Sequence, residues 1–139
     1  TIETGIFAAA NYPTAFGVFV KYSSGKVAKL VGAEATTDVV GVLVRPYPTQ
    51  YTSSEALGTS TPDITKLANI LKRGYIMVAL GFGTAVKGAQ VYACVNVAGG
   101  NAIGDIGDNS DSDNCIAVPG AYFTGAADED GNVEIAYNI

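Results

Sequence analysis

The chain has 139 residues, a formal net charge of −5, no histidine and no tryptophan, and only 15% of its residues are charged, where about 25% is typical. Without histidine, the side chain most used for acid–base catalysis and metal binding is missing, so the composition disfavours most enzymatic and metal chemistry. The length predicts one domain.

The first third of the chain predicts an arm followed by strands. Residues 1–13 are predicted to form an extended N-terminal arm, apolar in patches, that ends at a proline. Residues 15–31 predict a hairpin with its turn at 23–25, because apolar side chains alternate along its first strand. The near-continuous apolar run at 39–44 predicts a strand that is buried on both faces or lies inside a barrel.

The middle of the chain contains a long loop and an ambiguous segment. Residues 46–63 include three of the five prolines and little that would form a core. A loop of this length in a compact domain is typically functional or disordered, so it is the first candidate for a contact surface. Residues 64–73 fit either a helical stripe or a strand, and both interpretations stay open at this point.

The last part of the chain predicts strands again. Residues 75–82 and 90–97 are rich in β-branched and aromatic residues, and residues 99–114 form a polar loop. The end predicts a hairpin over residues 115–139, whose turn contains Asp130 followed by glycine, a strong hairpin signal.

Seven or eight short strands with turns about every 8–12 residues predict an all-β fold. We expect a single jelly-roll or β-barrel/sandwich domain over residues 14–139, preceded by the arm at 1–13. No internal repeat is apparent. No secretory signal and no membrane-length apolar run of about 18 residues is found, which predicts a soluble protein made in a cytoplasm, with no membrane partner.

Several groups of residues are candidates for chemical sites. Four carboxylates between Asp105 and Asp113 could hold Ca²⁺, but their spacing does not match an EF-hand, and a solvated turn is favoured, so no metal or cofactor is predicted. Cys94 and Cys115 are interpreted as buried thiols in strands in preference to a disulfide. No nucleophile has a recognisable activating partner, and the glycine-rich stretch at 81–88 is a hairpin connection in preference to a phosphate loop, so no enzyme is predicted.

The charges are unevenly distributed. Residues 1–87 hold all eight basic residues, whereas residues 88–139 hold eight of the 13 acidic ones and no basic residue. Separated signs favour head-to-tail pairing or docking on a complementary partner, although a solvated acidic face explains most of the acidic residues. The distribution disfavours direct nucleic-acid binding, which needs a basic stripe.

The chain resembles the small capsid cement, or decoration, proteins of tailed bacteriophages. The likeness is carried by AFGVFVKYSSGKVAKLV with TTDVVGVLVRPY, by RGYIMV with TAVKGAQVYACV, and by AVPGAYFTGAADEDGNVEIAYNI at the end. These are strand and turn patterns with placed glycines, not catalytic signatures. The loops at 46–63 and 99–114 lie outside the resemblance.

The resemblance implies a β-barrel or jelly-roll virion protein that sits on the outside of the phage head and bridges neighbouring major capsid proteins, after synthesis in the host bacterial cytoplasm. It also implies self-association, for which we expect a homodimer in preference to a trimer. The alternative is a carbohydrate-binding or adhesin-type β-domain that uses Tyr47, Tyr51 and Ca²⁺ at the aspartate cluster. The candidate capsid-contact residues, chosen from the arm and the long loop, are Ile2, Ile6, Phe7, Tyr12, Tyr47, Tyr51 and Leu57.

Overall fold

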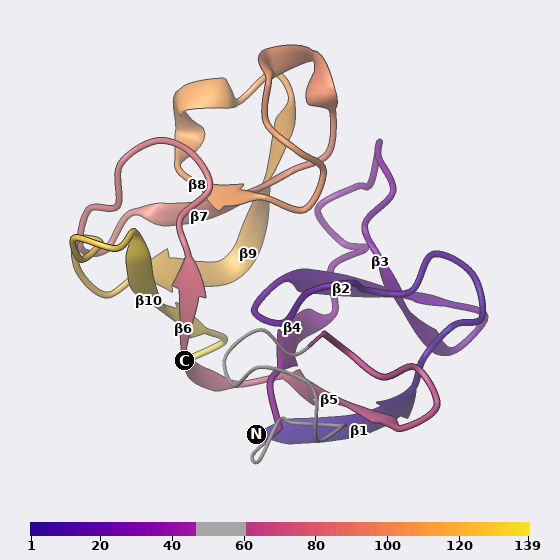
Figure 1. Ribbon diagram of the computed structural model, residues 1–139. Coiled ribbons are helices and arrows are strands. Elements are labelled where there is room, and N and C mark those ends of the chain that lie inside the picture. The colour runs from indigo at the N-terminus through magenta and orange to yellow at the C-terminus, as the bar shows by residue number, and fades with distance from the viewer. Residues whose placement is uncertain (47–60) are drawn as a thin grey trace.

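The structure, a computed structural model, describes residues 1–46 and 61–139 and confirms an all-β chain with two antiparallel sheets (Figure 1). Sheet A contains β1 (Ile2–Ile6), β2 (Phe19–Ser23), β3 (Lys26–Lys29), β4 (Gly41–Val44) and β5 (Leu67–Leu71). Sheet B contains β6 (Gly74–Ala79), β7 (Gln90–Cys94), β8 (Ile106–Gly107), β9 (Cys115–Phe123) and β10 (Asn132–Tyr137). The short 3-10 helices η1 (Val97–Gly99) and η2 (Asn109–Asp111) lie in the second half. No helix in the described part of the chain is long and apolar enough to cross a membrane.

The two sheets have the same topology. Their strand orders are β1-β5-β4-β2-β3 and β6-β10-β9-β7-β8, so each strand of sheet A has a counterpart in sheet B. Each sheet also curls back on itself after its first strand. The N–H of Ala8 donates to the carbonyl of Val27 over 2.9 Å, and the N–H of Gly81 donates to the carbonyl of Ile106 over 2.7 Å.

Backbone contacts match between the two halves. Gly17 donates to Leu43 over 2.8 Å, and at the equivalent place Gly88 donates to Phe123 over 2.7 Å. The chain therefore consists of two structurally equivalent halves, although its sequence shows no internal repeat. Equivalent residues in β4 and β9 are 80 positions apart, whereas those in β5 and β10 are only 65 apart, so no fixed period exists.

Strand β4 is buried on both faces, as predicted for residues 39–44. Phe19 and Val42 face sheet B and belong to the larger apolar core, which also contains Val91 and Phe123. The next residue on β4, Leu43, instead packs inside the curl of sheet A, in a smaller second core. Each face of β4 packs into a different core. The strand is therefore an uninterrupted apolar run in place of the usual alternation of apolar and polar residues.

The N-terminal segment contains a strand. Ile2–Ile6 form an edge strand paired residue for residue with β5, and Phe7 is 6% exposed in the smaller core. Gly5 sits against Val27, because a Cβ there would meet the Val27 Cγ2 at 3.0 Å. No strand was predicted here because the large apolar side chains of β1 point outward, which reverses the pattern of a half-buried strand.

Candidate interaction surfaces

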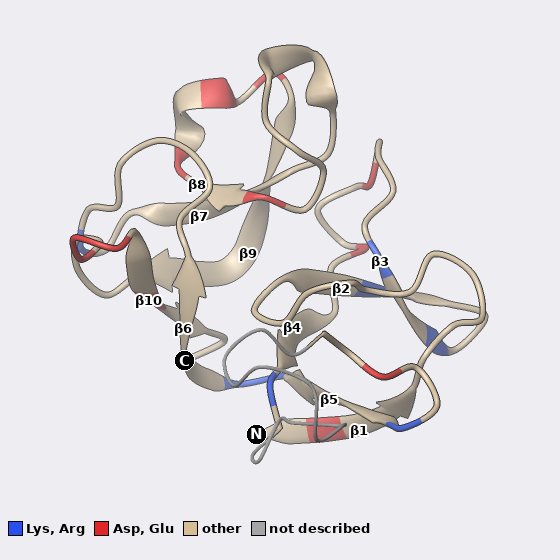
Figure 2. Cartoon of the chain, in the orientation of Figure 1, with Lys and Arg blue, Asp and Glu red and all other residues tan. Residues whose placement is uncertain are grey.

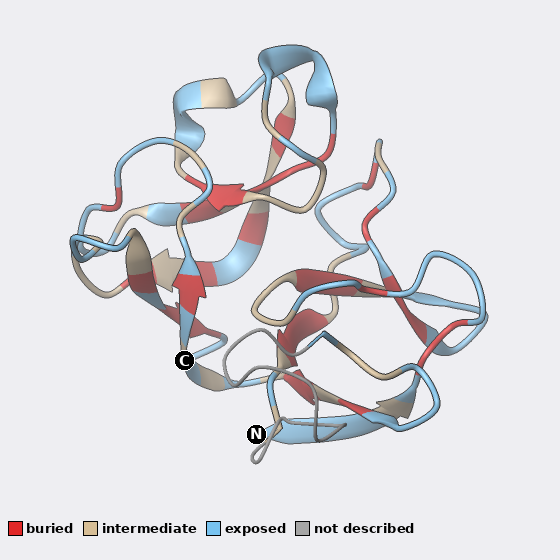
Figure 3. Cartoon of the chain, viewed as in Figure 1, coloured by how far each residue is buried: buried red, intermediate tan, exposed pale blue. Residues whose placement is uncertain are grey.

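An aliphatic patch lies on the outer face of β1 and β5. Ile2, Ile6 and Leu67 are 50%, 60% and 63% exposed, and Ile6 is the register partner of Leu67. Figure 3 shows β1 exposed along its length. Alternation along β1 brings Ile2 and Ile6 to the same face. Several large aliphatic side chains gathered at a sheet edge are typical of an interaction site.

The other predicted contact residues differ in where they lie in the structure. Phe7 is a core residue, so its side chain is not available to a partner. Tyr12 is 38% exposed and lies after the strand. The positions Tyr47, Tyr51 and Leu57 lie outside the described residues. Leu67 was missed because 64–73 had no settled secondary structure. Its assignment to a strand would have identified it.

A polar cluster closes one end of sheet A, and sequence reasoning did not find it. The Tyr22 hydroxyl donates to the Glu3 carboxylate, and the Lys72 Nζ lies 3.9 Å from the Glu3 Oε2 and 4.9 Å from the centre of the Tyr22 ring. Lys72 also donates to the carbonyl of Val40 over 2.9 Å. Three elements distant in sequence thus meet in one exposed network, which we call the polar end.

Two tyrosines, Tyr122 and Tyr75, lie in one register row across sheet B. Cross-strand register runs from Gln90 to Tyr122, then to Ala136, and then to Tyr75. Tyr75 is 56% exposed, and its strand-mate Met77 is 59% exposed. We call these four register partners the tyrosine row. Such side chains combine large contact area with hydrogen-bonding groups, as in many protein interfaces.

Asp105 and Asp108, in the 99–114 loop, accept hydrogen bonds from backbone N–H groups. Asp105 accepts from the N–H of Ala102 over 3.0 Å, and Asp108 accepts from the N–H groups of Ser110 and Thr84 over 2.8 and 2.9 Å. Burial raises the pKa of Asp108, but these hydrogen bonds outweigh it and keep that pKa below its usual range. Within residues 1–46 and 61–139, no three acidic or cysteine side chains converge as a metal site.

Both cysteines are buried free thiols. Cys94 and Cys115 are register partners on β7 and β9. Burial, followed by the neighbouring Cys94 and Asp111, raises the pKa of Cys115 to about 12. A thiol with that pKa is almost entirely protonated at neutral pH, which is the opposite of an activated nucleophile.

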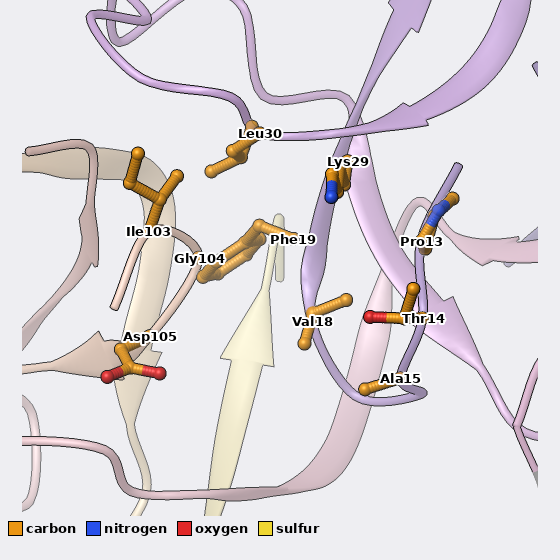
Figure 4. A pocket seen from close by; sticks show the side chains of 10 residues that line it. All are labelled: Pro13, Thr14, Ala15, Val18, Phe19, Lys29, Leu30, Ile103, Gly104 and Asp105. Carbon is orange, nitrogen blue, oxygen red and sulfur yellow. The ribbon is translucent and has the colours of Figure 1, made fainter. Parts of the chain in front are cut away.

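A cavity of about 210 Å³ lies where the two halves meet (Figure 4). Its walls come from residues 13–19, from the end of β3 and from residues 103–105, and its charged members are Lys29 and Asp105. The carboxyls with lowered pKa that are at least partly buried, Glu34 and Asp108, lie elsewhere.

Charge is divided between the two halves of the structure (Figure 2). Seven of the eight basic residues precede β6, and eight of the 13 acidic residues follow it. The acidic residues of the second half gather in its loops, around the aspartate loop and the turn before β10. The halves are thus electrostatically complementary to each other.

The sequence matches the family described as XM1 gp53 minor capsid protein over residues 1–137. A chain in the solved structure "The capsid of Myoviridae Phage XM1" has a similar fold, with a TM-score of 0.69 and 18% sequence identity. That similarity covers 99% of this chain and 82% of the other. No functionally curated protein matches the sequence.

Proposed function

Because this chain belongs to the XM1 gp53 minor capsid protein family, it is a structural protein of a bacteriophage capsid, and we propose that it acts there as a cement protein. In this role it binds the outside of the head and bridges neighbouring copies of the major capsid protein. The bridge stabilises the shell against the pressure of the packaged DNA. The protein works as a homodimer and supplies contacts, not catalysis.

The observation that carries the proposal is the aliphatic patch of Ile2, Ile6 and Leu67 on the edge of sheet A. Exposed aliphatic side chains on one face of a sheet edge support docking on a shell, because their burial against a partner stabilises the complex. The contact of one copy can be weak, because many copies on a symmetric shell act together and an oligomer binds through several sites at once.

The first experiment is co-sedimentation of the purified protein with DNA-filled heads that lack it, followed by heating. We expect saturable binding at a fixed ratio to the major capsid protein and a higher temperature of head rupture. Binding only to the inner surface of opened shells would contradict the cement role. The absence of binding to both intact heads and opened shells would also contradict it.

Point substitutions then test the patch. Ile6→Asp should weaken binding to heads at least tenfold, since it places a charge among aliphatic side chains without touching either core. Val97→Asp is the matched control, because Val97 is also 60% exposed but lies in η1, in the other half. If both variants bind heads equally well, the patch is not part of the interface.

Deleting residues 1–12 is not a suitable test. The deletion would remove β1, leaving β5 as an unpaired edge, and would also remove Phe7 from the smaller core. Loss of head binding by that truncation would then report unfolding and not a lost contact.

A further inference from the structure

The contact between the two halves of the chain uses one face of sheet A. Register across sheet A runs from Phe19 to Val42, then Leu71, then Ile2. The first three of these side chains are buried in the larger core. Phe19 also packs against Tyr137, with ring centres 6.2 Å apart. A row on the outside of sheet A thus covers sheet B at the last residue of β10.

The repeat identifies the equivalent of this row in sheet B. Pairing of Leu43 with Ile70, and of Phe123 with Ile135, sets the correspondence between the halves. By that correspondence, the row Phe19–Val42–Leu71–Ile2 becomes the tyrosine row, Gln90–Tyr122–Ala136–Tyr75. The first row is apolar, and its first three members are buried while Ile2 is 50% exposed. The second row is partly polar, with Ala136 buried and Tyr75 56% exposed.

The covered end of sheet B also has an equivalent. Tyr137 corresponds to Lys72, and Ile76 corresponds to Glu3, because each lies at the same register position relative to Ile135 or Ile70. In sheet B this end is apolar and is packed by sheet A. In sheet A it is the polar end, where the side chains of Glu3 and Lys72 are 52% and 26% exposed.

We propose that the tyrosine row of one copy docks on the polar end of a second copy, which repeats between chains the contact made within each chain. Each pairing then joins surfaces of like character. Inside the chain, the apolar row of sheet A packs on the apolar end of sheet B, and between chains the tyrosine row packs on the polar end. The division of charge supports a second copy of this chain as the partner, since this contact brings the acidic half of one copy to the basic half of the other. Two copies that exchange both contacts form a closed dimer of four sheets.

This inference names the self-contact of the proposed homodimer and rests on that part of the proposed function. It is tested on the free protein by light scattering after size-exclusion chromatography. The wild-type protein should have the mass of a dimer. Tyr75→Asp, which adds a charge to the row, and Lys72→Glu, which reverses a charge at the polar end, should each halve that mass.

Mixing the two variants gives the sharper result. Each variant retains the surface that the other has lost, so an equimolar mixture should form a heterodimer through one intact contact. It should do so at concentrations where neither variant associates alone. Val97→Asp, with a similarly exposed parent side chain, should remain a dimer. If Lys72→Glu lowers the melting temperature substantially, Tyr22→Ala, which keeps every charge, replaces it.

Three outcomes would overturn the inference: a wild-type monomer at the highest soluble concentration, dimers that survive Tyr75→Asp, or dimers that survive Lys72→Glu. A symmetric dimer made through the tyrosine row alone is also distinguishable, because Lys72→Glu would leave it intact. Head binding is measured separately. A monomer that still binds heads refutes the inference but supports the cement role. A dimer that fails to bind heads supports the inference but contradicts the cement role.

Discussion

The ring of Phe19 on β2 packs against the ring of Tyr137 at the end of β10, with centres 6.2 Å apart and planes inclined at 58°. Both residues are buried, at 1% and 5% exposure. Tilted aromatic pairs of this kind stabilise beyond the area that they bury. Because one ring comes from each sheet, this contact couples the folding of the two halves.

Phe19→Ala should therefore lower the free energy of unfolding by about 3–5 kcal/mol, as expected for a large buried aromatic side chain. Urea denaturation followed by circular dichroism measures the change. Val86→Ala is the control, because Val86 is 58% exposed and should change stability by less than about 0.5 kcal/mol. Similar losses in the two variants would mean that the contact between the sheets does not control stability.

Gly41 begins β4 at a point where no side chain fits. A Cβ there would lie 2.4 Å from the Ile70 Cγ2 and 2.5 Å from the carbonyl oxygen of Leu71. Gly41→Ala should destabilise the protein by at least about 2 kcal/mol, since the backbone of the paired strand must move. Gly125→Ala has nothing within 4 Å and should be neutral or slightly stabilising. Comparison of the two melting curves tests the prediction, and equal curves would contradict it.

Sequence patterns identified the elements whose burial follows a simple rule. The hairpin of β2 and β3, the doubly buried β4, and the hairpin of β9 and β10 all follow from apolar runs and turn residues. β1 could not be found in this way, because its aliphatic side chains are exposed and its opposite face carries Glu3 and Gly5 in place of apolar residues. An interaction surface and a buried strand face look alike in sequence.

The repeat was hidden for a related reason. Equivalent positions carry unlike residues, such as Lys72 and Tyr137, because one end is exposed and the other is covered. The loops also differ in length, which removes any constant period. The polar end itself joins residues from three elements, so no local motif could reveal it. Only the folded chain brings Glu3, Tyr22 and Lys72 together.

Glu34 should make stability depend on pH. Its carboxylate accepts from the N–H groups of Val31 and Gly32 over 2.6 and 2.9 Å, and from Lys21 over 2.9 Å. Burial alone would raise the pKa of Glu34, but these hydrogen bonds hold it below its ordinary value of 4.5. A lowered pKa in the folded state stabilises the fold above pH 4.5, and that stabilisation is lost as the pH falls through the folded-state pKa.

Glu34→Gln should cost about 2 kcal/mol at pH 7 and should flatten the fall in stability below pH 4.5. Denaturant titrations at pH 3 to 7 measure both effects. Glu129→Gln is the control, because Glu129 lies exposed in the turn before β10. A Glu34→Gln variant with an unchanged pH profile would show that the carboxylate contributes no proton-linked stability.

The two buried thiols should react only when the protein opens. With the pKa of Cys115 raised to about 12 and both side chains buried, the thiolate that attacks a disulfide reagent is scarce in the folded state. Ellman's reagent at pH 8 should therefore modify neither thiol rapidly in native protein and both in urea. Val97→Cys supplies an exposed reference thiol that should react at once. Rapid modification of one thiol in the native wild-type protein would mean that the β7–β9 pair opens locally, well below the free energy of global unfolding.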